Sequence, residues 1–175
     1  GWVFLRSAEP WQRFFDLGLN TTTNCFCTPI GEAEDEGLRA RITTTGWGEE
    51  QGPTAPRIAT NRWVHLAVAL DAPRKILSIY RDGTRIGQTT GVETKVEQLL
   101  DEADARRTHF YIGKSHYDTD PYLNAKLHDL RIYNVALTDQ QIAAIHRNGL
   151  SGEKGGGSTK PAATNESSGA SASPY

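Results

Sequence analysis

Apolar and polar residues alternate along most of the chain with a period of two, which is typical of β-strands that bury one face. The segment Trp63–Leu70 shows this most clearly, because its even-numbered positions are all apolar while its odd-numbered positions are mixed. Such a strand packs one face against a second sheet. The pattern predicts strands at Trp2–Arg6, Arg13–Leu19, Asn24–Thr28, Leu38–Thr44, Trp63–Leu70, Ile76–Arg81, Arg85–Gln88, Phe110–Gly113 and Leu127–Tyr133.

Two local signals define a turn and a helix. Asp82-Gly83 separates two of the predicted strands, and this pair of residues tolerates the positive φ of a tight hairpin turn. Thr138 followed by Gln141 has the spacing of a capping box, which predicts the start of a short helix. Ile142 gives that helix an apolar stripe together with Ile145, and Asn148-Gly149 is a stop signal.

Length and composition limit the number of domains. The 175 residues, of which 37% are hydrophobic, can bury one sizeable core. We therefore expect one all-β domain over residues 1–150, built as a sandwich of two antiparallel sheets with one short C-terminal helix. Ser151–Tyr175 is rich in Gly, Ser, Ala and Pro and has almost no large apolar side chains, which predicts a disordered tail or linker.

The charge pattern argues against two classes of partner. Nineteen basic and twenty-one acidic residues leave a formal net charge of -2, and the basic residues form no block that could follow a phosphate backbone. The longest apolar runs have the length of strands, and none reaches the span of a bilayer. We therefore expect no nucleic-acid partner and no membrane insertion.

Cys25 and Cys27 are the only cysteines. We expect them to diverge to opposite faces of a strand, so that a bridge between them would be strained. The five histidines show no ligand spacing that would complete a metal site with these thiols. Both cysteines are therefore predicted to be buried, unpaired and hydrophobic in role.

Aromatic and polar residues in predicted loops suggest a sugar-binding surface. Sugar rings have weakly apolar faces on which Trp or Tyr can stack, while charged and amide groups bond to the hydroxyls. Trp47 lies between two glycines in a predicted loop. Further candidates are Tyr117, Asp118, Asp120 and Tyr122 in one loop, and Arg13 and Asp16 on one predicted strand.

A structural interpretation of the same residues stays open. Trp47 could pack over an end of the sandwich, and the Asp residues of the loop could hold a turn by accepting backbone N–H groups. Arg13 and Asp16 occupy odd and even strand positions, so we expect them on opposite faces unless a bulge intervenes. The acidic run Glu32–Glu36 is predicted to be a solvated loop. Signatures of a serine nucleophile and of a phosphate-binding glycine loop are absent from the sequence.

Five motifs of this chain follow one another in an order that resembles a known family. They are Trp11–Gly18, Arg62–Val68, Ile79–Gly83, Tyr111–Ser115 and Asp129–Thr138. The order resembles that of laminin-G-like domains of the concanavalin A-like lectin/glucanase superfamily, in particular modules appended to bacterial arabinofuranosidases and related glycosidases. The resemblance covers residues 2–150 and implies a jelly-roll sandwich with a non-catalytic role in carbohydrate binding or adhesion.

The resemblance also implies three details. Relatives begin with a further strand, so Trp2–Arg6 is expected at an open sheet edge that another chain could pair with. Relatives often place two adjacent acids where this chain has His128-Asp129, and one of those acids helps to hold a structural calcium ion. Asp129 is the matching ligand in this chain. His128 stands in place of the other acid, which removes a negative charge and carboxylate oxygen ligands from the expected calcium site. The glucanases carry a Glu-x-Asp-x-x-Glu strand, which this sequence lacks, so we expect no enzyme activity.

Three functions are therefore weighed. The first is a carbohydrate-binding, lectin-like or adhesion module with a glycan or glycoprotein as its partner. The second is an interaction module that docks into a larger assembly through Trp2–Arg6 and residues 151–175, and a glycosidase is a distant third. Two glycosylation triplets begin at Asn20 and Asn165, and they slightly favour a secreted or cell-surface location.

Overall fold

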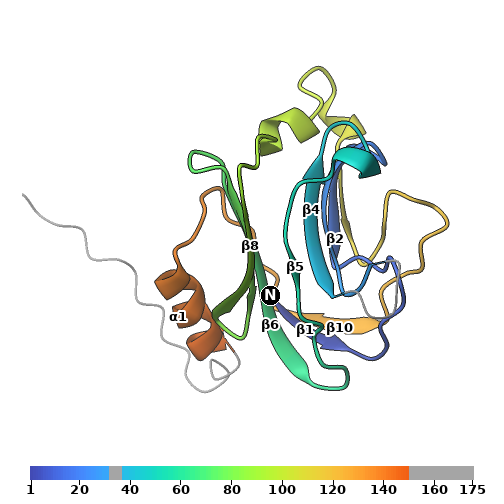
Figure 1. Cartoon of the computed structure of the whole chain (residues 1–175). Coiled ribbons are helices and arrows are strands. Elements are labelled where there is room, and N and C mark those ends of the chain that lie inside the picture. Colours follow the sequence, from blue (N-terminus) through green and yellow to red (C-terminus); the bar gives the residue numbers. More distant parts are fainter. Residues whose placement is uncertain (32–36, 150–175) are drawn as a thin grey trace, which may run out of the picture.

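The computed structural model describes residues 1–31 and 37–149 and contains two five-stranded antiparallel sheets that face each other (Figure 1). The first sheet has the order β10-β1-β6-β7-β8, and the second has the order β5-β4-β3-β2-β9. The strands are β1 Trp2–Leu5, β2 Phe15–Asn20, β3 Thr23–Thr28, β4 Leu38–Thr43, β5 Thr54–Ala55, β6 Trp63–Asp71, β7 Ile76–Arg81, β8 Thr84–Thr90, β9 His109–Ile112 and β10 Ala125–His128. The predicted all-β sandwich is confirmed.

The core lies between the two sheets and follows from the alternation of side chains. On β4, Leu38, Ala40 and Ile42 are fully buried, whereas the residues between them face away from the core. Cys25 and Cys27 lie two positions apart, so they project from the same face of β3 into this core. The prediction that they diverge was wrong, but both are buried and unpaired, and burial raises the pKa of Cys25 to about 12.

Strand β1 is internal to the first sheet, which corrects the expectation of an open edge at Trp2–Arg6. Trp2 pairs with His128 of β10 on one side and with His65 of β6 on the other. The first sheet instead has its edges at β10 and β8. Over Trp2–Leu5, β1 therefore has hydrogen-bonding neighbours on both sides.

Several other segments differ from the sequence prediction. The strand predicted at Leu127–Tyr133 begins earlier and ends at His128, where Asp129 has a φ of 53°, and within residues 1–31 and 37–149 no strand pairs with the residues after it. Strand β2 begins at Phe15, so Arg13 precedes it. The two-residue strand β5 and the 3-10 helix η1 (Trp47–Glu49) were not predicted. Residues 92–107, for which the sequence predicts a loop with one helical turn, contain two 3-10 helices, η2 (Val96–Leu99) and η3 (Ala105–Arg107).

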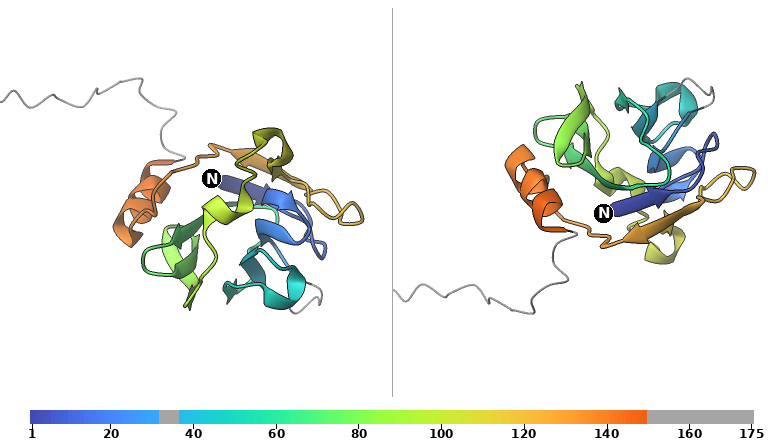
Figure 2. Two further views of the ribbon diagram at one scale, coloured as in Figure 1. Left: turned by 90° about the horizontal axis from the view of Figure 1, so that it is seen from above. Right: turned by 90° about the horizontal axis from the view of Figure 1, so that it is seen from below.

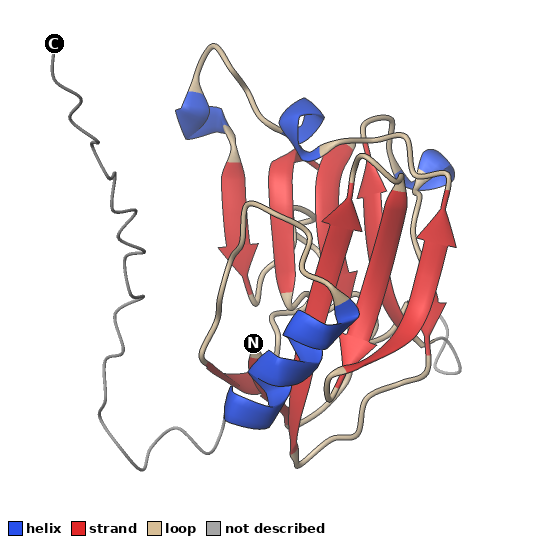
Figure 3. Cartoon of the chain, turned by 90° about the vertical axis from the view of Figure 1, so that its left-hand side faces the viewer, coloured by secondary structure: helices blue, strands red, loops and turns tan. Residues whose placement is uncertain are grey.

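Helix α1 (Asp139–Gly149) covers the outer face of the first sheet, away from the second sheet (Figures 2 and 3). Its predicted capping box is confirmed, since the Gln141 N–H donates to Thr138 Oγ1 at 3.3 Å and the Thr138 N–H donates to Gln141 Oε1 at 2.8 Å. Tyr80 of β7 donates its hydroxyl to Asp139 at 2.7 Å. At the other end of the helix, Gly149 lies so close to the Trp2 indole that a Cβ would collide with it.

The predicted turn at Asp82-Gly83 is also confirmed. Both residues have positive φ, 50° and 79°, and they join β7 to β8. The predicted tail Ser151–Tyr175 and the acidic run Glu32–Glu36 lie outside the described residues. Within residues 1–31 and 37–149, no helix has the length and apolar character that crossing a bilayer requires.

The capping box should contribute measurably to stability. Thr138→Ala removes the hydroxyl that accepts the Gln141 N–H, so we expect the free energy of unfolding to fall by about 1 kcal/mol in urea denaturation. Thr119→Ala is the matched control, because Thr119 lies exposed in a loop. Equal stability of the two variants would contradict a role for the cap.

His65 should make stability depend on pH. It is buried on β6, and desolvation, followed by the Gly1 ammonium group, lowers its pKa to about 4. The unfolded chain takes up this proton near pH 6.5, so between about pH 6.5 and 4 the unfolded state binds more protons than the folded state. The free energy of unfolding therefore falls as the pH is lowered through this window.

Urea denaturation at pH 7 and pH 4.5 measures this effect. We expect His65→Gln to lose less stability between the two pH values than the parent, whereas His109→Gln, which alters an exposed histidine of β9, should lose as much as the parent. An unchanged pH dependence in His65→Gln would show that other groups cause it.

Candidate functional site

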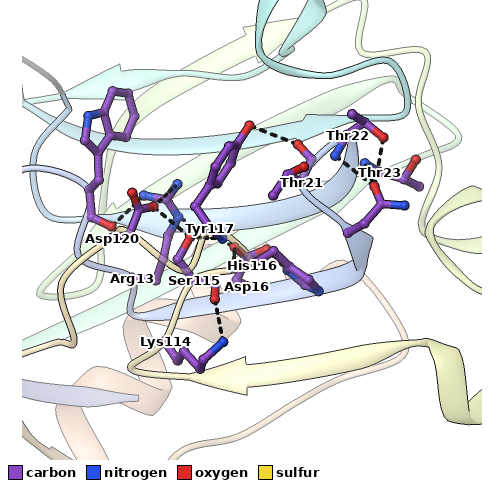
Figure 4. A network of polar contacts seen from close by, with 12 residues as sticks. Arg13, Asp16, Thr21, Thr22, Thr23, Lys114, Ser115, His116, Tyr117 and Asp120 are labelled. Carbon is purple, nitrogen blue, oxygen red and sulfur yellow. Dashed lines mark hydrogen bonds and ion pairs between the residues drawn. The ribbon is translucent and has the colours of Figure 1, made fainter.

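The outer face of the second sheet carries most of the predicted site residues. The loop of residues 113–122, which follows β9, crosses this face and is hydrogen-bonded to it (Figure 4). The His116 N–H donates to Asp16 Oδ2 of β2 at 3.0 Å. The Tyr117 hydroxyl donates to the Thr21 carbonyl oxygen, in the turn between β2 and β3, at 3.1 Å.

A buried guanidinium group lies at the centre of this arrangement. Arg13 is only 2% exposed, its guanidinium carbon lies 4.1 Å from the centre of the Phe26 ring, and Nη1 donates to the Trp11 carbonyl oxygen at 2.8 Å. Nε lies 3.7 Å from Asp16 Oδ2, and Nη2 lies 3.3 Å from Asp120 Oδ2. Burial lowers the pKa of Arg13, and the two carboxylates, Asp120 first, oppose that shift.

Arg13 and Asp16 therefore meet, contrary to the expected separation. Because Arg13 precedes β2, its side chain does not follow the alternation of the strand and reaches the outer face on which Asp16 lies. The contact needs no bulge within the strand.

Asp16 and Asp120 hold the loop, Asp16 by accepting a backbone N–H group and Asp120 through the side chains of Ser115 and Arg13. Ser115 Oγ donates to Asp120 Oδ2 at 2.7 Å and accepts the Tyr117 N–H at 3.0 Å. His116 Nδ1 lies 2.9 Å from Asp16 Oδ1. Both carboxylates are thus engaged by groups of the protein, and Asp16 is 0% exposed.

The other candidates are exposed. The exposed fraction is 82% for Trp47 and 71% for Tyr122, and for the Asp118 side chain it is 97%. The Tyr122 carbonyl oxygen accepts a hydrogen bond from Gln12 Nε2 at 3.0 Å, at the carboxyl end of the loop. The Lys114 ammonium group lies 3.7 Å from Asp118.

The loop that carries Trp47 and the Tyr117 side chain are both bonded to the β2–β3 turn. Trp47 opens η1, directly after Gly46, whose φ of 97° suits glycine. The Gly46 N–H donates to the Thr22 carbonyl oxygen at 2.9 Å, next to the Thr21 carbonyl oxygen that binds Tyr117. The structure thus brings the loop of Trp47 and the Tyr117 side chain to the same turn.

Sequence reasoning missed a pair of charged residues beside Trp47. Arg41 Nε lies 4.0 Å from Glu50 Oε2, and the two side chains are 13% and 16% exposed. Burial raises the pKa of Glu50, and Arg41 and Arg13 act against that shift. The sequence pattern could have indicated the position of Arg41. Arg39 and Arg41 alternate with buried residues on β4, so their side chains must face outward together.

An aromatic cluster on β9 was also missed. The rings of His109 and Tyr111 stack with centres 5.3 Å apart and an interplanar angle of 6°. The His116 ring lies 4.8 Å from the Tyr111 ring, and Lys114 Nζ lies 4.5 Å from its centre. The two residues of β9 share one face because they are two positions apart, which the sequence pattern could have indicated.

The surroundings of Asp129 do not fit a calcium site. Arg131 donates to both of its carboxylate oxygens, from Nε at 2.8 Å and from Nη2 at 2.6 Å, and these bonds lower the pKa of Asp129. Calcium takes about six to eight oxygen ligands. Among the residues that the structure describes, no three His, Cys, Asp or Glu side chains gather into a metal-binding group. Calcium binding at Asp129 stays a prediction that this arrangement does not support.

Comparison with known proteins defines the class. Residues 1–143 match the laminin-G family model described as the concanavalin A-like lectin/glucanases superfamily, so the chain belongs to this family. An α-L-arabinofuranosidase of Bifidobacterium longum subsp. longum is 28% identical over 121 residues, which cover 67% of this chain. The matched part is only 10% of that enzyme's length.

Two solved structures share the fold. Domain 4 of AbnA, a GH43 extracellular arabinanase from Geobacillus stearothermophilus in complex with arabinotriose, aligns with a TM-score of 0.63 and 20% identity over 83% of this chain and 63% of that one. The CBM40 domain of the Ruminococcus gnavus IT-sialidase, bound to α2,3-sialyllactose, aligns with a TM-score of 0.65 and 12% identity over 83% of this chain and 79% of that one. At these identities the likeness establishes the fold alone.

The buried carboxylate of Asp16 should be structural. Asp16→Asn leaves the Arg13 guanidinium with one carboxylate fewer in a buried place, so we expect the free energy of unfolding to fall by roughly 3 kcal/mol in urea denaturation at pH 7. Asp118→Asn is the matched control, and its 97% exposure predicts a change within about 0.5 kcal/mol. Similar losses in the two variants would contradict the anchoring role of Asp16.

Proposed function

We propose that this domain is a non-catalytic carbohydrate-binding module whose ligand lies over the outer face of the second sheet, beside Trp47 and Tyr117. One observation carries the proposal. Trp47 is 82% exposed, yet its loop is fixed to the β2–β3 turn next to a half-buried patch of charged and hydroxyl groups. An exposed indole ring beside polar groups is the arrangement that stacking on a sugar requires.

The chemistry of the patch suits a sugar. An indole ring can stack on the weakly apolar face of a sugar, and its position costs little entropy because the side chain has only two rotatable bonds. Arg41 offers donors and Glu50 offers acceptors to ring hydroxyls, beside the Tyr117 ring. Because Gly46 and Thr43 hold the start of η1 by hydrogen bonds, the loop is arranged before a ligand arrives.

The carboxylates of this face support a binding role over hydrolysis. Glycosidases need two carboxyl groups on either side of the scissile bond, about 5 to 9.5 Å apart. Asp16 and Asp120 instead engage Arg13 and the groups of the loop, and Asp16 has no exposed surface. Glu50 faces Arg41.

The relatives suggest which sugar to test first. One is an arabinofuranosidase, and the domain from the arabinanase was solved with arabinotriose. We therefore infer that arabinose-containing oligosaccharides are the ligand class, with sialylated glycans as the second choice because the sialidase domain was solved with sialyllactose. That arabinanase is described as extracellular, which supports a secreted or cell-surface location here too.

Calorimetric titration with arabinotriose tests the proposal. We expect Trp47→Ala to weaken binding at least tenfold, which corresponds to about 1.4 kcal/mol of stacking energy. Tyr133→Ala is the matched control, because this exposed tyrosine follows β10 outside the proposed site. Parent-like affinity of Trp47→Ala would contradict the site, and loss in Tyr122→Ala instead would move it to the carboxyl end of the loop.

The alternative, an interaction module, loses one of its two predicted surfaces. Strand β1 is paired on both sides, and residues 151–175 lie outside the described residues. The apolar groove along the second half of β6 is a different surface of the first sheet, and it is accessible.

A further inference from the structure

The turn between β2 and β3 holds two segments of the candidate site by hydrogen bonds. The Thr21 carbonyl oxygen accepts the Tyr117 hydroxyl at 3.1 Å, across 96 positions of the sequence. The next carbonyl oxygen along the chain, that of Thr22, accepts the Gly46 N–H at 2.9 Å, directly before Trp47. The Tyr117 side chain and the Trp47 loop therefore both depend on the conformation of this one turn.

The backbone of this turn is not of the kind that usually closes a hairpin. The two-residue loop Thr21-Thr22 joins the paired residues Asn20 and Thr23. The favoured two-residue hairpin turns need a positive φ, which a β-branched residue adopts only at a cost in energy. Neither Thr21 nor Thr22 has a positive φ. The turn therefore needs another source of stability.

Neither burial nor regular strand pairing supplies that stability. Asn20 and Thr22 are exposed, and Thr21 and Thr23 are half-buried. The register of β2 against β3 also shifts between Gly18 and Asn20, directly before the turn. The conformation of the turn is therefore fixed by neither the core nor an uninterrupted ladder.

The Asn20 side chain provides the missing contacts. Its Oδ1 accepts the Thr22 N–H at 2.8 Å, the Thr22 hydroxyl at 2.8 Å and the Thr23 N–H at 3.1 Å (Figure 4). An asparagine oxygen that accepts backbone N–H groups two and three residues ahead holds the chain in a turn. Three donors thus converge on one oxygen atom.

We propose that Asn20 is the positioning residue of the carbohydrate site. Its Oδ1 sets the turn, and the turn then directs two successive carbonyl oxygens to the Tyr117 hydroxyl and to the Trp47 loop. One side-chain oxygen therefore arranges both parts of the site before a ligand arrives, which lowers the entropy that binding costs. Asn20 acts through these contacts and requires no contact with the ligand. Its effect on a ligand rests on the proposed function, whereas its effect on the turn does not.

The geometry accounts for the residue type at position 20. The acceptor must reach N–H groups two and three positions ahead, which the short side chains of Asn and Asp can do. An acceptor alone is sufficient, because within residues 1–31 and 37–149 the Asn20 Nδ2 has no hydrogen-bond partner. Asn20→Asp should therefore preserve the turn, whereas Asn20→Ala should not.

Hydrogen exchange tests the turn without any ligand. We expect Asn20→Ala to speed exchange of the Gly46 amide about tenfold, because the Thr22 carbonyl oxygen that it donates to is no longer held in place. The amides of β7, a strand paired on both sides, should exchange as in the parent and show that the sandwich is intact.

Two variants complete the exchange experiment. Asn20→Asp should restore the parent rate at Gly46. Asn134→Ala is the matched control, because it removes an exposed asparagine of the segment after β10 and should leave that rate unchanged. Parent-like exchange in Asn20→Ala, or failure of Asn20→Asp to restore it, would overturn the proposal.

Calorimetric titration with arabinotriose tests the effect on the ligand. We expect Asn20→Ala to weaken binding about fivefold, since the ligand must then order the Trp47 loop and the Tyr117 side chain itself. Asn20→Asp and Asn134→Ala should bind as the parent does. Parent-like affinity of Asn20→Ala, measured together with fast exchange at Gly46, would reduce Asn20 to a structural role and overturn the proposal.

A double mutant tests whether the effect passes through Tyr117. Tyr117→Phe keeps the ring but removes the hydroxyl that donates to Thr21. Asn20→Ala should therefore weaken binding less in the Tyr117→Phe background than in the parent, and equal losses would overturn this route. Absence of arabinotriose binding by the parent would overturn the proposed function and, with it, the role of Asn20 towards a ligand. The exchange rate at Gly46 would still decide whether Asn20 holds the turn.

Discussion

The period-two alternation of side chains on β2, β3 and β4 is the constraint on which the rest of the structure depends. The inward residues of β4 are apolar and wholly buried, while Arg39 and Arg41 between them face outward. One stretch of backbone thus supports the core on one side and the candidate site on the other. Since a shift of register by one residue would exchange the two faces, the position of the site is fixed by the packing of the core.

The loop over the outer face depends on a second interaction, the burial of the Arg13 guanidinium. A buried cation is costly unless it is paired, and here two carboxylates, a backbone carbonyl group and an aromatic ring surround it. Asp16 belongs to a strand and Asp120 belongs to the loop. Arg13 therefore connects the loop to the sheet, and this connection helps to place Tyr117 at the β2–β3 turn.

Local patterns were sufficient to predict much of the fold. The alternation on β6, the positive-φ pair Asp82-Gly83 and the capping box of Thr138 each depend on neighbouring residues only, and each was confirmed. The sandwich follows because several amphipathic strands must bury their apolar faces together.

One error was local, since residues two positions apart share a face of a strand and Cys25 and Cys27 therefore both enter the core. The other errors concern contacts between distant segments. The residues after His128 have strand-like sequence, but a strand also needs a pairing partner, and pairing cannot be read from one segment alone. The same holds for β1, whose two neighbours are distant in sequence, and for the approach of Arg13 to Asp120. Glu50 was missed because its role depends on the ion pair with Arg41. That pair forms only because the loop between the two residues brings Glu50 back to β4, and the sequence does not show the path of this loop.

The contact between Trp2 and Gly149 has a geometric consequence. It brings the first strand and the last helix of the described domain together, with the Trp2 ring also 5.3 Å from the His146 ring. Polypeptide attached at either end would leave the sandwich from neighbouring points. Within a longer chain, such a domain would add little to the distance between the segments that flank it. The outer face of its second sheet would remain accessible to solvent.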